Sequence, residues 1–211
     1  MKTLPLTIFL AALILTGAAR ADFRDGVAAF RDGDYRRAAS MWQQDAEAGD
    51  PAAQRNLGLL YLNGLGVPRS ASRAADWFRR AADQSFAPAA ANLADLYLKG
   101  SGVPRDLGLA ADYLTQAAEA GHAESQHNLA VLHEHGVGVP KDVDTAIQWY
   151  RKAASRGFEK SRTRLAARAP EAPATDPDAA ETADQATAPR LNEPDGLGLV
   201  ENLVFLFAPA N

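Results

Sequence analysis

One loop occurs three times in this chain at a constant interval. Residues 64–69 are GLGVPR, residues 100–105 are GSGVPR and residues 136–141 are GVGVPK. The flanking sequence repeats with the loop, so that three blocks of 36 residues align without a gap. The blocks are residues 51–86, 87–122 and 123–158. Self-similarity at a period of about 20–50 residues is typical of a solenoid, in which one small unit is stacked on the next.

Each block predicts two helices joined by the loop. In the first block Leu57, Leu60 and Tyr61 occupy positions i, i+3 and i+4, and therefore form the apolar stripe of one amphipathic helix. A second stripe with helical spacing runs through residues 74–82. Gly64 is expected to end the first helix in a left-handed conformation, which glycine adopts without strain. The N-cap of the second helix is predicted at three equivalent positions: Ser70, Asp106 and Asp142.

The repetition follows from the need to bury these stripes. One helix pair cannot bury its own apolar face, whereas stacked pairs share a continuous core, and about three repeats are needed for stability. The array is predicted to continue at both ends. Residues 22–50 form an opening unit with a short GDY loop, and residues 159–169 form a single capping helix. The predicted fold class is all-α: an α/α superhelical solenoid of about four helix pairs plus a capping helix.

The three blocks resemble the Sel1-like repeat (SLR) family, whose members are related to tetratricopeptide repeats. The resemblance is carried by the Leu57-Gly58 pair, Tyr61, the GxGVP loop and the later Trp77 and Ala81-Ala82 positions. It covers about residues 23–168, and the opening unit is more similar to a tetratricopeptide repeat. The resemblance implies a right-handed superhelix and a non-catalytic scaffold or adaptor that binds other proteins. A penicillin-binding subgroup cross-links its repeats through cysteines, and this chain, which has none, does not resemble that subgroup.

The N-terminus has the pattern of a secretory signal peptide over residues 1–21. A 12-residue apolar run (4–15) is followed by Ala19 and Ala21, which stand at positions −3 and −1 of a cleavage site before Asp22. The run is shorter than the roughly 20 residues that a membrane-spanning helix needs. The chain has no cysteine, so the lipid-attachment residue of a bacterial lipoprotein is absent. The predicted location is therefore periplasmic or secreted.

Charge is distributed unevenly along the chain. Residues 22–168 contain 19 Lys/Arg and 18 Asp/Glu, whereas residues 169–211 contain one Arg and eight acids. Residues 151–168 contain seven basic residues and one acid. A balanced core argues against a nucleic-acid partner, which requires a basic face to neutralise phosphates.

The candidate binding residues lie on the first helix of each block, which by the resemblance to tetratricopeptide repeats lines the concave face. The equivalent positions are Arg55, Ala91 and His127; Leu59, Asp95 and Val131; and Asn63, Lys99 and His135. They vary between blocks while the apolar stripe stays constant. Such variation suits a surface matched to a ligand, and free solvent exposure explains it equally well. The candidate protein-binding residues are Arg55, Leu59, Asn63, Asp95, Lys99, His127, Val131 and His135.

Three equivalent asparagines, Asn56, Asn92 and Asn128, have two interpretations. The favoured one is a structural side chain that bridges neighbouring helices, and the alternative is a ladder that binds a peptide backbone. Neither interpretation involves a cofactor, and none is predicted.

The histidines and Ser125 could in principle carry chemistry. All four histidines lie within residues 122–135, but His133 and His135 point in nearly opposite directions on one helix, so they do not converge on a metal. Ser125 is close in sequence to His122 and His127, yet no acid is placed behind a base. We therefore predict no metal site and no enzyme activity.

The acidic C-terminal region has two parts. Residues 170–190 lack large apolar side chains, and we expect a disordered acidic linker there. Residues 191–211 include the mostly apolar run 197–207, which is too short to span a bilayer and is expected to dock. Its docking residues are Leu199, Leu203, Phe205 and Phe207. The alternatives are docking on the chain's own solenoid, with the acidic linker along residues 151–168, and docking on a partner protein or a membrane surface.

The leading functional hypothesis is an exported repeat scaffold that binds a protein or peptide in the bacterial envelope. The first alternative is a cell-envelope hydrolase with an unrecognised site. The second is an assembly factor that contacts the membrane through residues 197–207.

Overall fold

The computed structural model describes residues 23–168, and every regular element in that range is a helix. The predicted all-α solenoid is confirmed. A helix at residues 23–31 opens the array. It is followed by α2 (Tyr35–Glu47), α3 (Pro51–Asn63), α4 (Ala71–Ala82), α5 (Ala87–Lys99), α6 (Leu107–Glu119), α7 (Ala123–His135), α8 (Val143–Ser155) and α9 (Glu159–Ala166).

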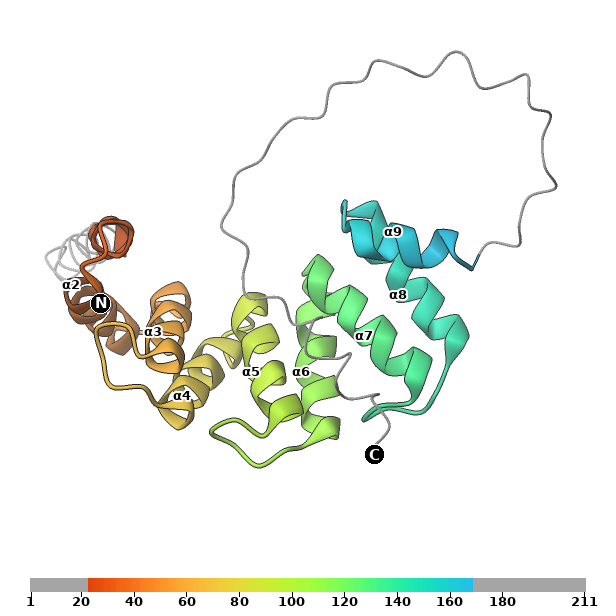
Figure 1. The fold of residues 1–211 in the computed structure, drawn as a ribbon, viewed down its shortest axis with the longest axis horizontal. Helices are drawn as coiled ribbons and strands as arrows, with labels where there is room; N and C mark the ends of the chain where they lie inside the picture. The colour runs from red at the N-terminus through yellow and green to blue at the C-terminus, as the bar shows by residue number, and fades with distance from the viewer. Residues whose placement is uncertain (1–22, 169–211) are drawn as a thin grey trace, which may run out of the picture.

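The helices follow one another along a curved row, from α2 at one end to α9 at the other (Figure 1). Each helix packs on the next in the sequence, and the closest pairs are α3 with α4, α5 with α6 and α7 with α8. These pairs are the three 36-residue blocks. In addition α3 approaches α5, so the first helices of the first two blocks are neighbours.

The helix ends have the predicted local chemistry. Gly64 ends α3 at φ 70°, and its N–H donates to the carbonyl oxygen of Leu60. Gly100 and Gly136 end α5 and α7 in the same left-handed conformation. The N-caps of α4, α6 and α8 each accept a hydrogen bond from a backbone N–H in the first turn, and they are Ser70, Asp106 and Asp142.

The second glycine of each loop makes a contact between repeats. A Cβ at this position would overlap backbone atoms at the start of the second helix of the preceding unit. The pairs are Gly66 with Tyr35, Gly102 with Ala71 and Gly138 with Leu107. The sequence predicts only a tight turn here. The structure adds a reason for the loop to recur, because each repeat must offer room for the backbone of its neighbour.

The core runs continuously through the stack. One buried cluster extends from α4 to α7 and includes Phe78, Leu96, Leu114 and Leu132. A second cluster, around Trp42, joins the opening unit to α3. Trp77 packs against this second cluster, so helix pairs share their apolar side chains as the repeat pattern predicts.

Candidate functional site

The predicted binding residues form three rows that cross α3, α5 and α7. Members of a row are one repeat apart and occupy equivalent helical positions. The first row is Arg55, Ala91 and His127, the second is Leu59, Asp95 and Val131, and the third is Asn63, Lys99 and His135. The rows differ in exposure, and exposure rises from the first row to the third.

The first row is largely interior. Ala91 is 3% exposed and His127 is 5% exposed. Arg55 is half-buried, and its Nε donates to Oδ1 of Asn92 on α5 at 3.1 Å. Burial lowers the pKa of Arg55. This row therefore connects neighbouring helices and offers little surface to a ligand.

The second and third rows form the accessible surface. Leu59, Asp95 and Val131 are half-buried, and the third row is exposed. We define the accessible face as these two rows: Leu59, Asn63, Asp95, Lys99, Val131 and His135. It presents aliphatic side chains on α3 and α7 and a charged pair on α5.

The charged pair on α5 is internally compensated. Lys99 Nζ lies 2.6 Å from Oδ2 of Asp95, one helical turn away. Burial raises the pKa of Asp95, and the ammonium of Lys99 opposes this shift. On α3, Nδ2 of Asn63 donates to the carbonyl oxygen of Leu59. The accessible face therefore has little net charge, and a ligand would gain more from apolar contact and hydrogen bonds than from long-range attraction.

His127 is buried and does not lie on an open concave face. Its Nδ1 is 2.8 Å from Oγ of Ser161 on α9, and its ring packs against Tyr150 and Phe158. Burial lowers the pKa of His127 to about 4, and the nearby Lys160 and Arg164 act in the same direction. The resemblance to tetratricopeptide repeats predicts an open position here, but Ser161 of α9 and the preceding Phe158 cover His127 in the last repeat.

Of the three repeated asparagines, Asn92 bridges neighbouring helices, as the structural interpretation expects. Asn92 accepts the hydrogen bond from Arg55, which links the first repeat to the second. Asn128 is fully buried, and its amide makes no hydrogen bond within the described residues. The residue one repeat after Arg55 is Ala91, which has no donor to offer Asn128.

The histidine and serine candidates have local roles. His122 is the N-cap of α7, and its Nδ1 lies 2.8 Å from Oγ of Ser125. Ser125 is fully buried, so its hydroxyl does not face a substrate. Burial lowers the pKa of His122, with a further contribution from Arg55. Within residues 23–168 no group of three or more histidine, aspartate or glutamate side chains is arranged to hold a metal.

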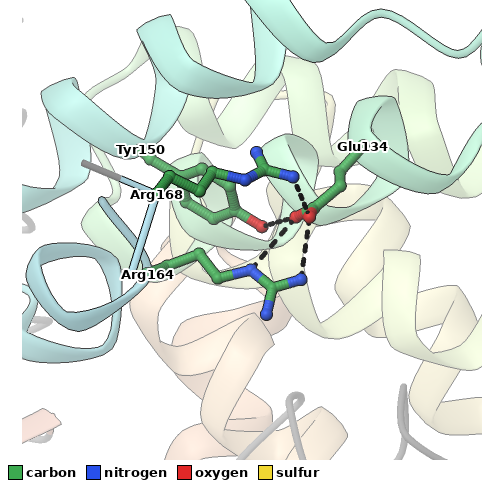
Figure 2. A network of polar contacts seen from close by, with 4 residues as sticks. All are labelled: Glu134, Tyr150, Arg164 and Arg168. Atoms are coloured by element: carbon green, nitrogen blue, oxygen red, sulfur yellow. Dashed lines mark hydrogen bonds and ion pairs between the residues drawn. The ribbon is translucent and has the colours of Figure 1, made fainter. Parts of the chain in front are cut away.

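A polar network at the end of the stack is not predicted by the sequence (Figure 2). Glu134 on α7 is 7% exposed, accepts a 2.6 Å hydrogen bond from the hydroxyl of Tyr150 and pairs with Arg164 and Arg168. Burial opposes ionisation, but the hydrogen bonds from Arg164 and Tyr150 lower the pKa of Glu134. Burial and the carboxylate of Glu134 raise the pKa of Tyr150.

Two members of the network, Glu134 and Tyr150, occupy positions that are apolar in the preceding repeat. Leu98 stands one repeat before Glu134, and Leu114 stands one repeat before Tyr150. A glutamate in an otherwise apolar column is the signal that could have identified this site. Glu134 allows the last repeat to pair with a basic capping helix, whereas each earlier repeat packs on another helix pair through apolar residues.

The remaining predictions concern the ends of the chain. No helix in the described part is both long enough and apolar enough to cross a membrane. The signal peptide, the acidic linker and the docking residues Leu199, Leu203, Phe205 and Phe207 lie outside the described residues.

Two solved structures are similar in both fold and sequence. A Sel1 repeat protein from Oxalobacter formigenes is 33% identical with a TM-score of 0.65, and the match covers 68% of this chain and 57% of that one. The protective antigen c5321 of uropathogenic Escherichia coli, described as displaying an SLR fold, is 31% identical with a TM-score of 0.68. That match covers 77% of this chain and 36% of the antigen, so the chain spans only part of either relative.

A more distant structure shares the fold alone. Cysteine rich protein B of Helicobacter pylori is 19% identical with a TM-score of 0.53, and the match covers 62% of this chain and 96% of that one. Among curated proteins no match was found.

The Sel1 repeat model matches residues 51–86, 87–122 and 123–158, which are the blocks defined by the GxGVP loop. These blocks make up more than half of the chain. Sel1 repeats generally mediate protein–protein interactions, and their fold is typically a non-catalytic scaffold. On the evidence of the stacked helix pairs, the recurring loop and this match, the chain belongs to the Sel1 repeat family.

Proposed function

We propose that this chain is an exported scaffold that binds a protein or peptide through the accessible face of α3, α5 and α7. The observation that carries the proposal is the contrast between positions. Residues that pack the stack are similar from repeat to repeat, whereas the accessible face changes from Leu59 to Asp95 to Val131 along one row. Because stability does not require these half-buried residues to differ, their variation is suited to recognition of one ligand.

The chemistry of the face indicates the kind of ligand. Leu59 and Val131 offer apolar contact on either side of the Asp95–Lys99 pair. The third row supplies hydrogen-bonding groups at the rim, from Asn63 to His135. A segment with aliphatic side chains and free backbone polar groups fits this arrangement, since it would contact all three helices at once.

Site-specific photocrosslinking tests the proposed face. A photoreactive amino acid at Lys99 or at His135, in the full chain expressed in its native host, should give a product of defined mass. Asp112 is the matched control, because it is also exposed and lies on α6, in the second helix of a pair. The same product at all three positions, or none at Lys99 and His135, would count against the accessible face.

Substitution of the face provides an independent measurement. The triple change Asn63→Ala, Lys99→Ala and His135→Ala alters exposed residues and should lower recovery of the crosslinked partner while leaving the melting temperature unchanged. The control change is Asp76→Ala, Asp112→Ala and Gln148→Ala, which also alters exposed residues one repeat apart. Equal recovery with both variants would remove the proposal.

Export rests on the sequence of residues 1–21. We propose a periplasmic or secreted location, and N-terminal sequencing of the protein purified from its host should begin at Asp22. A mature protein that retains Met1 in the cytoplasmic fraction would contradict export.

Membrane contact through residues 197–207 is a second proposal, supported by the apolar character of that run. It requires liposome binding that is lost when residues 196–211 are deleted.

A further inference from the structure

The C-terminal end of the stack presents an uncovered helix. α9 packs on α8 as α7 packs on α6, and it therefore occupies the place of the first helix of a pair. α3, α5 and α7 are each covered by the second helix of their own pair. Within the described residues no second helix covers α9. One side of α9 is thus free to receive another segment.

This end carries a concentration of positive charge. Lys160 and Arg164 lie one turn apart on α9, and Arg168 follows the end of the helix. Lys160 is exposed, and Arg164 and Arg168 stay partly exposed although they reach Glu134 on α7. The last two turns of α8 and the following turn add Arg151, Lys152 and Arg156. We define the basic end as residues 151–168, which contain seven basic residues and one acid.

Local acids compensate only part of this charge. Glu159 pairs with Arg162 on the same helix. Glu134 on α7 is the buried acid that faces α9, and one carboxylate serves both Arg164 and Arg168. Lys152 is exposed, and its Nζ lies 3.8 Å from the centroid of the Trp149 ring. An excess of exposed positive charge therefore remains for an acidic segment.

We propose that the acidic stretch 171–184 of this chain binds the basic end. It contains five acids, Glu171, Asp176, Asp178, Glu181 and Asp184, and no basic residue. Sixteen residues separate Arg168 from Asp184, and a chain of that length spans at most about 55 Å when extended. α9 has eight residues and is about 12 Å long. The stretch can therefore reach all of α9 and the adjoining end of α8.

Covalent connection favours this occupant over any free acidic partner. A segment attached a few residues from its binding surface acts at an effective concentration of about millimolar. Weak charge pairs are then sufficient for binding, and they should be sensitive to salt. The Debye length falls from about 10 Å at 0.1 M salt to about 3 Å at 1 M. The proposal concerns the end of the stack and is independent of what the accessible face binds.

Paramagnetic relaxation in the full mature chain tests the proposal. The chain has no cysteine, so Ala180→Cys gives a single attachment point for a nitroxide label. We expect selective broadening of amide signals in residues 151–168, unchanged on dilution and relieved at about 1 M salt, where screening is strong. Signals of α3 and α4 should keep their full intensity.

Charge reversal supplies the matched comparison. Arg151→Glu with Lys160→Glu changes two exposed residues of the basic end outside the Glu134 network, and it should remove the broadening. Arg31→Glu with Arg36→Glu makes the same charge change at the other end of the stack and should leave the broadening intact. Three results would overturn the proposal. The broadening could be unselective, it could disappear on dilution because a second copy is the partner, or both variants could have equal effects.

Discussion

Ser85 has the least favourable backbone conformation among the described residues. It is the non-glycine residue in residues 23–168 with a positive φ, 63°, and it follows α4 at the turn into α5. The equivalent turns use Gly49, Gly121 and Gly157, all with positive φ. A residue with a Cβ in this region carries strain of about 1 kcal/mol or more. The first repeat therefore keeps the turn at a cost that its neighbours avoid.

Replacing Ser85 by glycine should stabilise the protein. We expect Ser85→Gly to raise the free energy of unfolding by about 0.5–1 kcal/mol, because relief of strain exceeds the added chain entropy of glycine. Denaturant unfolding followed by circular dichroism measures the change. The reverse substitution, Gly157→Ser, is the matched control, since φ is 86° there and a Cβ would meet no atom within 4 Å. A loss of stability in Ser85→Gly would contradict the interpretation.

His127 should make stability depend on pH. Its pKa is about 4 in the folded protein and about 6.5 in an unfolded chain, so the unfolded state binds a proton first as the pH falls. His127 therefore contributes its full stability above pH 6.5, and about 3 kcal/mol is lost as the pH falls to 4.

The variant His127→Phe keeps a ring against Tyr150 and Phe158 but does not titrate. Its free energy of unfolding should change less than that of the parent between pH 6.5 and 4. The lowered pKa of His122 contributes to both proteins and cancels in the difference. Parallel pH profiles would contradict the burial of a neutral His127.

At the scale of single residues, the sequence predicts what depends on local chemistry. Gly64 and Ser70 have their predicted roles because a helix end is determined by a few neighbouring residues. The burial of His127 could not be predicted in this way. Its environment depends on α9, which begins 32 residues later and follows the last block of the periodic pattern.

At the scale of the elements, the loop glycines connect one helix pair to the next. Gly102 combines φ 73° with backbone atoms of Ala71 in the place of a Cβ, and backbone cannot move aside without shifting a whole helix. We expect Gly102→Ala to lower the free energy of unfolding by about 2–4 kcal/mol, from strain and overlap together.

The matched control for this substitution is Gly33→Ala. Gly33 also has a positive φ, 80°, but no atom lies within 4 Å of its Cβ position. It should therefore lose only the conformational contribution of about 1–2 kcal/mol. Equal losses in thermal or chemical unfolding would show that the close approach between repeats contributes nothing to stability.

The Glu134 network should hold α9 on the stack. Glu134→Leu with Tyr150→Phe restores apolar residues of the kind found at Leu98 and Phe78, and it removes the acceptor shared by Arg164 and Arg168. Hydrogen-exchange protection of α9 should fall by about 1–3 kcal/mol while α3–α6 keep theirs.

Tyr150→Phe alone is the control for this prediction, because it leaves the arginine pairs with Glu134 in place. This single variant should lower the hydrogen-exchange protection of α9 by about 1 kcal/mol or less. Unchanged protection of α9 in the double variant would show that apolar contacts hold the helix. The network could not be predicted from periodicity, because two of its four side chains follow the last block.

At the scale of the whole molecule, the stack is a series of interchangeable units. The fold could be predicted because all three blocks have the same sequence pattern, so that each copy supports the assignment of helices in the other two. The location of the binding surface could be predicted only in part. The resemblance identifies the helices that carry it but does not indicate how deeply each row of residues is buried. The accessible face is narrower than the predicted set, because it excludes the half-buried Arg55 and the buried His127.

Deletion of the middle repeat is the most direct test that the helix pairs are equivalent. Removal of residues 87–122 joins Phe86 to Ala123, places Asn128 opposite Arg55 and sets Gly138 against Ala71, as the periodicity requires. Circular dichroism and small-angle scattering should show a helical, shorter molecule that unfolds in a single cooperative transition at lower temperature. Loss of helical structure or of cooperative unfolding would contradict the stacking of equivalent pairs.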